Sequence, residues 1–268
     1  MSKLGKLRET IEGLEDIKNI LSAMKNLSIV EFNKVSRYLL LESKATENIE
    51  NALTDFTSFF NLSRDMPERE RLFILVGSER GLCGGFNQLV INYFESHFEA
   101  TKADHFFLIG NKLLSRYSEK FLAAQNMPGP SSAEEIPFCI NELGQRLMEF
   151  SHLRWVIISN SLEQDKIVAT EVWPLEFSAK KTKRQFFTPP RLNLAPKVFY
   201  TQLLEHYLFS MFYKTLYLSF MAENKERLMH MEGALKKLDQ QWQHLTVKAN
   251  ILRQEEITEE IEVILLGR

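Results

Sequence analysis

The sequence predicts an α/β domain flanked by two long helices that pair as an antiparallel coiled coil. All eight prolines lie between Pro67 and Pro196. Since proline costs about 3 kcal/mol in a helix interior, the chain on either side is free to form uninterrupted helices. Between the two ends, short apolar runs alternate with helical patterns, which is typical of a largely parallel sheet covered by helices.

The two ends of the chain carry helical apolar stripes. The first helix is expected over residues 3–57 and the last over residues 198–265. Apolar residues recur at steps of three and four in the first, at Leu4, Leu7, Ile11, Leu14, Ile17, Leu21 and Met24. The last helix carries the a/d pattern of a coiled coil at Leu235, Leu238, Trp242, Leu245, Ala249 and Leu252. Neither helix can bury its stripe alone, so the two are predicted to pair.

Strands and helices are predicted to alternate in the middle of the chain. Strands are expected at Leu72–Val76, His105–Ile109, Trp155–Ser159 and Ile167–Trp173, with helices at Gln88–Glu99, Asn111–Ala124 and Glu142–Phe150. The last two strands are expected to form a hairpin that turns around residues 163–166. The Pro-, Gly- and Ser-rich segment Met127–Pro137 is expected to be a surface loop, and the basic run Lys180–Arg184 a solvated linker.

These patterns divide the chain into four parts. Residues 1–60 form the N-terminal coiled-coil helix and residues 68–178 the α/β domain. Residues 179–197 form a return linker, and residues 198–268 the C-terminal coiled-coil helix.

Composition excludes several classes of function. The formal charge of −2 lacks the positive excess that is typical of nucleic-acid-binding proteins. The six histidines are scattered without metal-ligand spacing. Two cysteines are too few for a disulfide framework, which indicates a reducing compartment. No stretch approaches 18 apolar residues, so an integral membrane protein is not expected. The sequence predicts no metal, no cofactor and no catalytic residue.

The most informative segment is Ser78–Asn87, which follows a predicted strand and precedes a predicted helix. Its glycines, at positions 81, 84 and 85, indicate a sharp turn or a close approach to the backbone. A phosphate cradle at the helix N-terminus is one interpretation, and it leaves open a nucleotide-binding enzyme that uses Gly81–Gly85. The segment matches neither GxGxxG nor GxxxxGK[ST], which favours a structural turn made by Gly81, Cys83, Gly84 and Gly85. Because no Cys, His or Lys lies near Cys83 in the sequence, a buried structural thiol is expected.

Three separated motifs resemble the gamma subunit of F-type ATP synthases. Ser78–Asn87 is similar to the family signature S/T-D-R-G-L-C-G-G-L-N, with Glu79 for Asp and Phe86 for Leu. Near the C-terminus, Asn250–Ile261 resembles N-R-A-R-Q-x-x-I-T-x-E-I/L, and in the first helix Ala23-Met24-Lys25 matches part of T-K-A-M-K-M-V-A. The resemblance covers essentially the whole chain in the expected order.

The resemblance implies a rotor shaft without catalytic residues. In the family, the paired helices stand inside a ring of alpha and beta subunits, and the α/β domain forms a foot with epsilon on the membrane c-ring. It implies beta-subunit contacts at Arg253, Gln254, Thr258 and Met24, and a peripheral place on the cytoplasmic face of a bacterial plasma membrane. A coiled-coil adaptor that resembles gamma only in outline is the other alternative.

The charge of the first helix departs from the family pattern. The family's first helix is usually strongly basic, whereas residues 1–58 hold 8 Lys and Arg against 9 Asp and Glu, a net of −1. This departure suggests a divergent paralogue, from a second ATPase operon or a sodium-linked enzyme.

Overall fold

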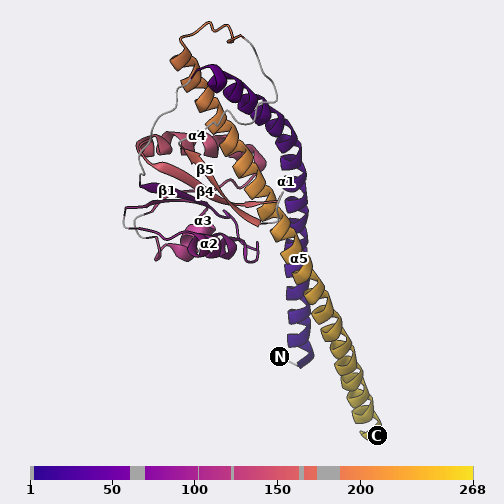
Figure 1. Cartoon of the computed structure of the whole chain (residues 1–268). Helices are drawn as coiled ribbons and strands as arrows, with labels where there is room; N and C mark the ends of the chain where they lie inside the picture. The colour runs from indigo at the N-terminus through magenta and orange to yellow at the C-terminus, as the bar shows by residue number, and fades with distance from the viewer. Residues whose placement is uncertain are drawn as a thin grey trace. The chain divides into compact units, whose positions relative to one another are not determined.

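The computed structural model describes residues 3–60, 70–101, 103–121, 124–162, 166–173 and 188–267. In chain order the elements are α1 (Lys3–Phe59), β1 (Arg71–Val76), α2 (Phe86–His97), β2 (His105–Ile109), α3 (Asn111–Tyr117), β3 (Gln125–Met127), the 3-10 turn η1 (Ala133–Glu135), α4 (Ile136–Leu147), the 3-10 turn η2 (Met148–Phe150), β4 (Arg154–Ser161), β5 (Lys166–Trp173) and α5 (Pro196–Leu266). The predicted fold class, a sheet with helices plus two long terminal helices, is confirmed (Figure 1).

The chain divides into two compact units. The larger, Glu31–Glu226, holds the sheet, the short helices and the adjoining parts of α1 and α5. The smaller combines Met1–Val30 with Arg227–Arg268, the terminal parts of the same two helices. The four-part division inferred from the sequence remains a prediction.

The sheet has five strands in the order β3-β2-β1-β4-β5. The pairs β3–β2, β2–β1 and β1–β4 are parallel, whereas β4 and β5 are antiparallel. The largely parallel sheet and the final strand pair are therefore confirmed, although the hairpin turn at 163–165 and the basic run at 180–184 lie outside the described residues.

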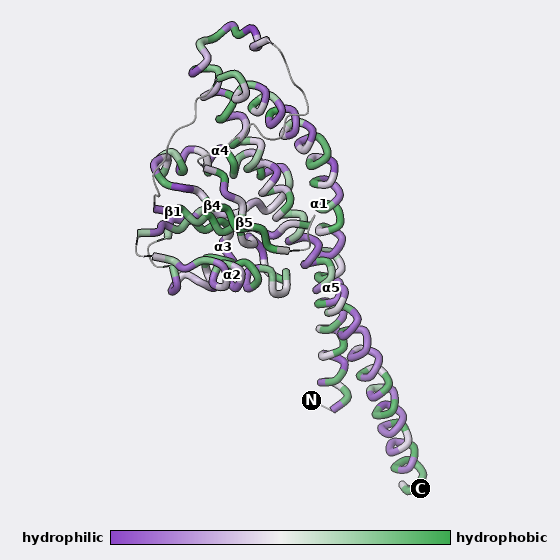
Figure 2. Tube along the Cα trace, in the orientation of Figure 1, coloured by the Kyte–Doolittle hydropathy of each residue, from purple (hydrophilic) through white to green (hydrophobic). Residues whose placement is uncertain are grey.

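Helices cover both faces of this sheet (Figure 1). Because successive strand residues point to opposite faces, the odd and even positions of β1 enter different cores. Leu72, Ile74 and Val76 pack against α4 and against residues of α1 and α5. Phe73 and Leu75 pack on the other face against α2 and α3. The strands buried on both sides form the most hydrophobic part of the trace in Figure 2.

Three short elements differ from the sequence prediction. Helix α3 ends at Tyr117 rather than Ala124, because the chain turns back so that Gln125–Met127 can pair with β2, a strand that the sequence analysis missed. Helix α4 begins at Ile136 rather than Glu142, since Pro137 lies in its first turn, where a missing backbone N–H costs little. The expected surface loop Met127–Pro137 was wrong in part, because its apolar side chains are buried: Met127, Ala133 and Ile136.

Within the larger unit, α1 and α5 are joined by a mixture of rings and polar groups. Phe56 of α1 lies against Phe199 of α5, with ring centroids 5.3 Å apart. Further along, the hydroxyls of Thr46 and Ser210 are 2.6 Å apart, and Ser210 donates to Glu42 Oε1 at 2.7 Å. A directional hydrogen bond between two helices favours one register over its neighbours.

In the smaller unit, α1 and α5 pair as an antiparallel coiled coil. Lys18 binds Asp239 and Lys25 binds Glu232, each at 2.7 Å. From Lys18 to Lys25 is seven residues, and from Asp239 back to Glu232 is also seven, so the register is constant over one heptad. The predicted seam of α5 from Leu235 to Leu252 is confirmed, since none of its six residues is exposed.

The seam of α1 corrects one predicted position. Its less exposed residues alternate by three and four through Leu14, Lys18, Leu21 and Lys25, whereas Ile17 is 48% exposed. The prediction placed Ile17 in the stripe because it lies three residues after Leu14 and four before Leu21. A lysine can lay its aliphatic stem along the seam while its ammonium group binds a carboxylate at the edge.

The two methionines at the start of the smaller unit's part of α5 provide a matched test. Met231 is fully buried and Met229 is 48% exposed. We expect Met231→Ala to lower the free energy of unfolding by about 2–5 kcal/mol, because it leaves a cavity. Met229→Ala should change it by less than about 0.5 kcal/mol. Chemical denaturation followed by circular dichroism measures both, and equal losses would contradict this assignment of the seam.

Candidate functional site

The turn after β1 is built around Ser78. Its backbone N–H donates to Asn87 Oδ1 at 2.9 Å, and Asn87 Nδ2 donates to Ser78 Oγ at 2.9 Å. The Cys83 thiol donates to the same hydroxyl at 3.2 Å. All three side chains are buried. The segment singled out in the sequence is thus closed by hydrogen bonds among its own residues.

The predicted turn glycines differ in what they contribute. Gly84 has a φ of 56°, in the left-handed region that favours glycine. The exposed Leu82, two residues earlier, also has a positive φ, of 63°. Gly85 precedes α2 with an ordinary φ of −87°, and a Cβ there would meet nothing within 4 Å. A Cβ at Gly81 would lie 3.8 Å from Lys112 Cε, which is ordinary contact. Gly84 therefore has the clearest conformational need for glycine among the three.

Two further glycines of this region were missed in the sequence analysis. Gly77 and Gly110 follow β1 and β2 directly, and this position after adjacent strands was the signal that could have found them. A Cβ on Gly77 would lie 2.4 Å from Leu113 Cβ. Gly110 has a φ of 106°, and its Cβ would lie 2.7 Å from the Ser78 carbonyl oxygen. Only glycine lets the ends of β1 and β2 approach so closely.

The carboxylate of Glu79 occupies the carboxyl ends of β1, β2 and β3. Its Oε2 accepts hydrogen bonds from the backbone N–H groups of Asn111, at 3.0 Å, and Gly129, at 2.7 Å. Its Oε1 accepts from Asn111 Nδ2 at 2.6 Å. In nucleotide-binding α/β domains, N–H groups at strand ends and helix N-termini bind phosphate. Here the chain's own carboxylate takes those donors, and its negative charge opposes a phosphate at this place.

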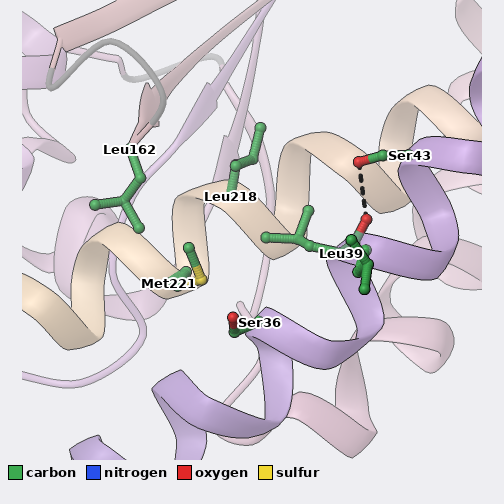
Figure 3. A pocket seen from close by; sticks show the side chains of 7 residues that line it. Ser36, Leu39, Ser43, Leu162, Leu218 and Met221 are labelled. Carbon is green, nitrogen blue, oxygen red and sulfur yellow. Dashed lines mark hydrogen bonds between the residues drawn. The ribbon is translucent and has the colours of Figure 1, made fainter.

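An open apolar pocket of about 370 Å³ lies between α1, α5 and the end of β4 (Figure 3). It is lined by Ser36, Leu39, Leu40, Ser43, Leu162, Leu218 and Met221. The Ser43 hydroxyl donates to the Leu39 carbonyl at 2.8 Å. The volume is in the range of small-molecule sites, but the lining has no charged group to act as an acid or base.

Neither a metal cluster nor a membrane span is found among the described residues. No group of three or more His, Cys, Asp or Glu side chains in that part of the chain could hold a metal ion. No helix there is long and apolar enough to cross a membrane. The half-buried Cys139 is unsuited to nucleophilic work, because burial and the nearby carboxylates of Glu135 and Glu142 raise its pKa to about 11.

The residues predicted to contact a beta subunit lie on the terminal helices. Arg253, Gln254 and Thr258 are exposed on α5, and the Thr258 hydroxyl donates to the Gln254 carbonyl at 2.8 Å. Gln254 and Thr258 belong to one exposed face of α5, on which residues recur at steps of three and four. The other members of this face are apolar: Val247, Ile251, Ile261 and Leu265. This face is separate from the α5 seam and leaves an apolar surface uncovered.

Met24 is half-buried on α1. It continues a second exposed apolar row, formed by Ile17, Ile20 and Leu27, which are 48%, 59% and 47% exposed. Both terminal helices of the smaller unit therefore present apolar residues outside the face that pairs them.

A family model described as ATP synthase matches residues 3–268 of the chain. The chain belongs to the ATP synthase family. It is 22% identical to the ATP synthase gamma chain of Bdellovibrio bacteriovorus and 24% identical to that of Mesoplasma florum. Each alignment covers 100% of this chain and 98% of its relative, so within the ATP synthase family the chain belongs with the gamma chains.

Solved ATP synthase structures share its fold. A chain of the rotor of the Euglena gracilis mitochondrial ATP synthase aligns with a TM-score of 0.67 at 15% identity, covering 95% of this chain and 98% of that one. A chain of the central stalk and c-ring of the Tetrahymena thermophila mitochondrial enzyme aligns with a TM-score of 0.58 at 16% identity, covering 80% and 99%.

Alanine at two glycines tests the geometry of the turn. We expect Gly110→Ala to lower the free energy of unfolding by at least about 2 kcal/mol, because of its positive φ and its contact with the Ser78 carbonyl. Gly85→Ala should stay within about 0.5 kcal/mol of the parent. Thermal unfolding of the two variants separates these outcomes, and a stable Gly110→Ala protein would refute the close approach.

Thiol labelling tests the environment of the two cysteines. Cys83 is buried and Cys139 has a pKa raised to about 11, so at pH 8 only about one Cys139 in a thousand is a thiolate. We expect slow reaction of the native protein with a chromogenic disulfide reagent, and fast reaction of two thiols after unfolding. A Cys139→Ser variant reports on Cys83 alone, and rapid native labelling of that variant would contradict the burial of Cys83.

Proposed function

We propose that this chain is the central-stalk rotor subunit of an F-type ATP synthase, which transmits torque between a membrane c-ring and a catalytic ring of alpha and beta subunits. The observation that supports the proposal best is the similarity to gamma chains over 100% of the chain. The two ends of the chain form long helices that pair with each other, which agrees with a central stalk. A stiff helical pair that biases several catalytic states at once is a physical means of coupling them.

The proposed role is non-catalytic. A nucleotide-binding enzyme using Gly81–Gly85 was the first alternative, and the hydrogen bonds that join Ser78, Cys83 and Asn87 argue against it, since the turn is closed by its own buried side chains. The second alternative, a coiled-coil adaptor, does not account for the match to gamma chains across the α/β domain as well as the helices.

The proposed partners are alpha, beta and epsilon subunits and the c-ring. The α/β domain, residues 68–178, serves as the foot near the c-ring. The terminal helices, residues 1–60 and 198–268, enter the catalytic ring of alpha and beta subunits. The exposed apolar end of α5 supports this arrangement, because Ile264, Leu265 and Leu266 are 69–86% exposed and such a patch marks a contact surface. We place the complex on the cytoplasmic face of a bacterial plasma membrane.

Arg253, Gln254, Thr258 and Met24 are the proposed contacts with beta subunits. Arginine offers several donors in a fixed fork, which suits a carboxylate on a partner loop. Gln254 and Thr258 are one helical turn apart on the exposed face of α5, so they present polar groups within an apolar surface.

The double variant Arg253→Ala with Gln254→Ala tests this contact. We expect the isolated chain to keep its helix content and melting temperature, because both side chains are exposed. Assembly with alpha and beta subunits, or ATPase activity coupled to ion transport, should fall several-fold, since buried charged hydrogen bonds at an interface are worth more than exposed ones.

The matched control replaces Lys236 and Lys237 by alanine, since both are exposed on the same helix. Circular dichroism of the free subunit and activity of the reconstituted complex are the two measurements. Full coupled activity of the Arg253 and Gln254 variant in a complex of normal stability would assign these residues to an ordinary solvated surface.

Reconstitution tests the function itself. The chain is added to alpha, beta and epsilon subunits of its own organism, and then to membranes that lack a gamma subunit. We expect co-purification and restored ATP-driven ion pumping, whereas the isolated chain should show no saturable ATP binding. Co-purification without pumping would favour an adaptor, and ATP binding by the free chain would favour an enzyme.

A further inference from the structure

Glu31 is a buried carboxylate that joins α1 to the α/β domain. The residue is 5% exposed, and its Oε2 accepts a hydrogen bond of 2.8 Å from the backbone N–H of Ala133. Its Oε1 accepts from Lys34 Nζ at 3.1 Å, and Lys34 also binds Glu134 Oε1 at 2.8 Å. Two residues of α1 therefore hold the first turn of η1, the segment that leads into α4.

The contact supplies a cap that the local sequence does not. Ser132 precedes η1 with extended backbone angles, but its side chain makes no capping hydrogen bond. The N–H groups at the start of a helix need an acceptor, and the positive end of the helix dipole favours a negative one. Glu31 meets both needs from a position 102 residues earlier in the chain.

The charges around this contact support each other. The hydrogen bond from Lys34 lowers the pKa of Glu134, and the bonds to Glu134 and Glu31 raise the pKa of Lys34. A buried carboxylate is stable only when it is paired and hydrogen-bonded, and Glu31 has both a cation and a backbone donor. The ion pair between Lys34 and Glu134 therefore stays charged at neutral pH, beside the hydrogen bond from Ala133 to Glu31.

The hydrogen bond between Glu31 and Ala133 depends on direction, whereas the apolar contacts around it do not. Val35 and Leu39 of α1 pack in the same core as Ala133, Ile136 and Ile140. The hydrophobic effect that buries these side chains is itself non-directional. A charged hydrogen bond to a backbone N–H has a narrow range of favourable angles, so it opposes sliding of the α/β domain along α1.

We propose that Glu31, with Lys34, is the latch that transmits torque between the α/β domain and the helical shaft. The inference rests on the proposed rotor function, in which force must pass between these two parts. Glu31 acts as a positioning residue: it holds η1, the turn that leads into α4, on α1. When the latch is removed, the α/β domain shifts on the shaft under load, and hydrolysis and ion transport lose their fixed ratio.

The experiment measures ATP-driven ion pumping per ATP hydrolysed in reconstituted complexes. Two variants remove the same bond from opposite sides: Glu31→Ala removes the acceptor, and Ala133→Pro removes the donor. Proline is tolerated in the first turn of a helix, and Ser132 already has the extended backbone that proline requires before it. Glu47→Ala, an exposed glutamate of α1, is the matched control.

We expect the pumping ratio to fall at least about threefold in both variants, because a charged hydrogen bond shifts an equilibrium by about tenfold or more. ATP hydrolysis by the complex should stay near the parental rate, and Glu47→Ala should leave the ratio unchanged. The double variant should be no worse than the worse single one, since the two changes remove one shared bond. Glu31→Gln, which keeps an acceptor but not the charge, should be intermediate.

The outcomes separate the latch from a merely structural role and from the rotor proposal. A folded Glu31→Gln or Glu31→Ala complex with the parental pumping ratio would overturn the latch, as would additive losses in the double variant. If Glu31→Ala fails to fold, Glu31→Gln and Ala133→Pro decide the question by the same ratio. If the parental chain itself restores no pumping, the rotor proposal fails first.

Discussion

Each of the two long helices has an apolar stripe that it cannot bury alone, and the antiparallel pairing of α1 with α5 is the constraint on which the rest of the structure depends. The pairing requires the chain between the helices to leave and return at one end, which is where the α/β domain is inserted. It also completes that domain. One face of the sheet is closed by α4 together with residues of α1 and α5, including Val35, Leu39, Phe212 and Leu216. The sheet and the helical pair therefore share a core within the larger unit, and a change in one is felt in the other.

Carboxylates placed against backbone N–H groups are a second recurring device. Glu79 takes donors that follow two parallel strands, β2 and β3, and Glu31 takes the first donor of η1. Sites of this kind bind anionic ligands in many α/β proteins. In this chain the anion is supplied from within, so the donors serve to hold loops and helices together. In the proposed function, a fold that often hosts nucleotide chemistry serves as a mechanical element.

The sequence predicted most of the elements because their signals are local. Proline placement and steps of three and four specify α1 and α5, and aromatic and β-branched runs specify β1, β2, β4 and β5. It missed β3, whose residues Gln125 and Asn126 become a strand only by pairing with β2. It misjudged Ile17, because the use of Lys18 in the seam depends on Asp239 at the other end of the chain.

The site was less predictable for the same reason. The importance of Ser78–Asn87 was visible in its glycines, but the partners of Glu79 and Glu31 lie on segments far away in the sequence, at Gly129 and Ala133. Residues such as Arg253 and Thr258 are exposed on α5, and the contacts proposed for them would be made with surfaces of other proteins. The contacts predicted for these residues therefore remain predictions, whereas membership of the ATP synthase family is shown by the match over residues 3–268.

The equal spacing of the two ion pairs, Lys18 with Asp239 and Lys25 with Glu232, has a consequence for how such a chain can change over generations. Adding one residue to α1 between the pairs would rotate everything beyond it by about 100° and separate the partners on α5. Only a change of a whole heptad on both helices would restore the contacts. The segments at opposite ends of the chain must therefore lengthen or shorten together, by whole heptads.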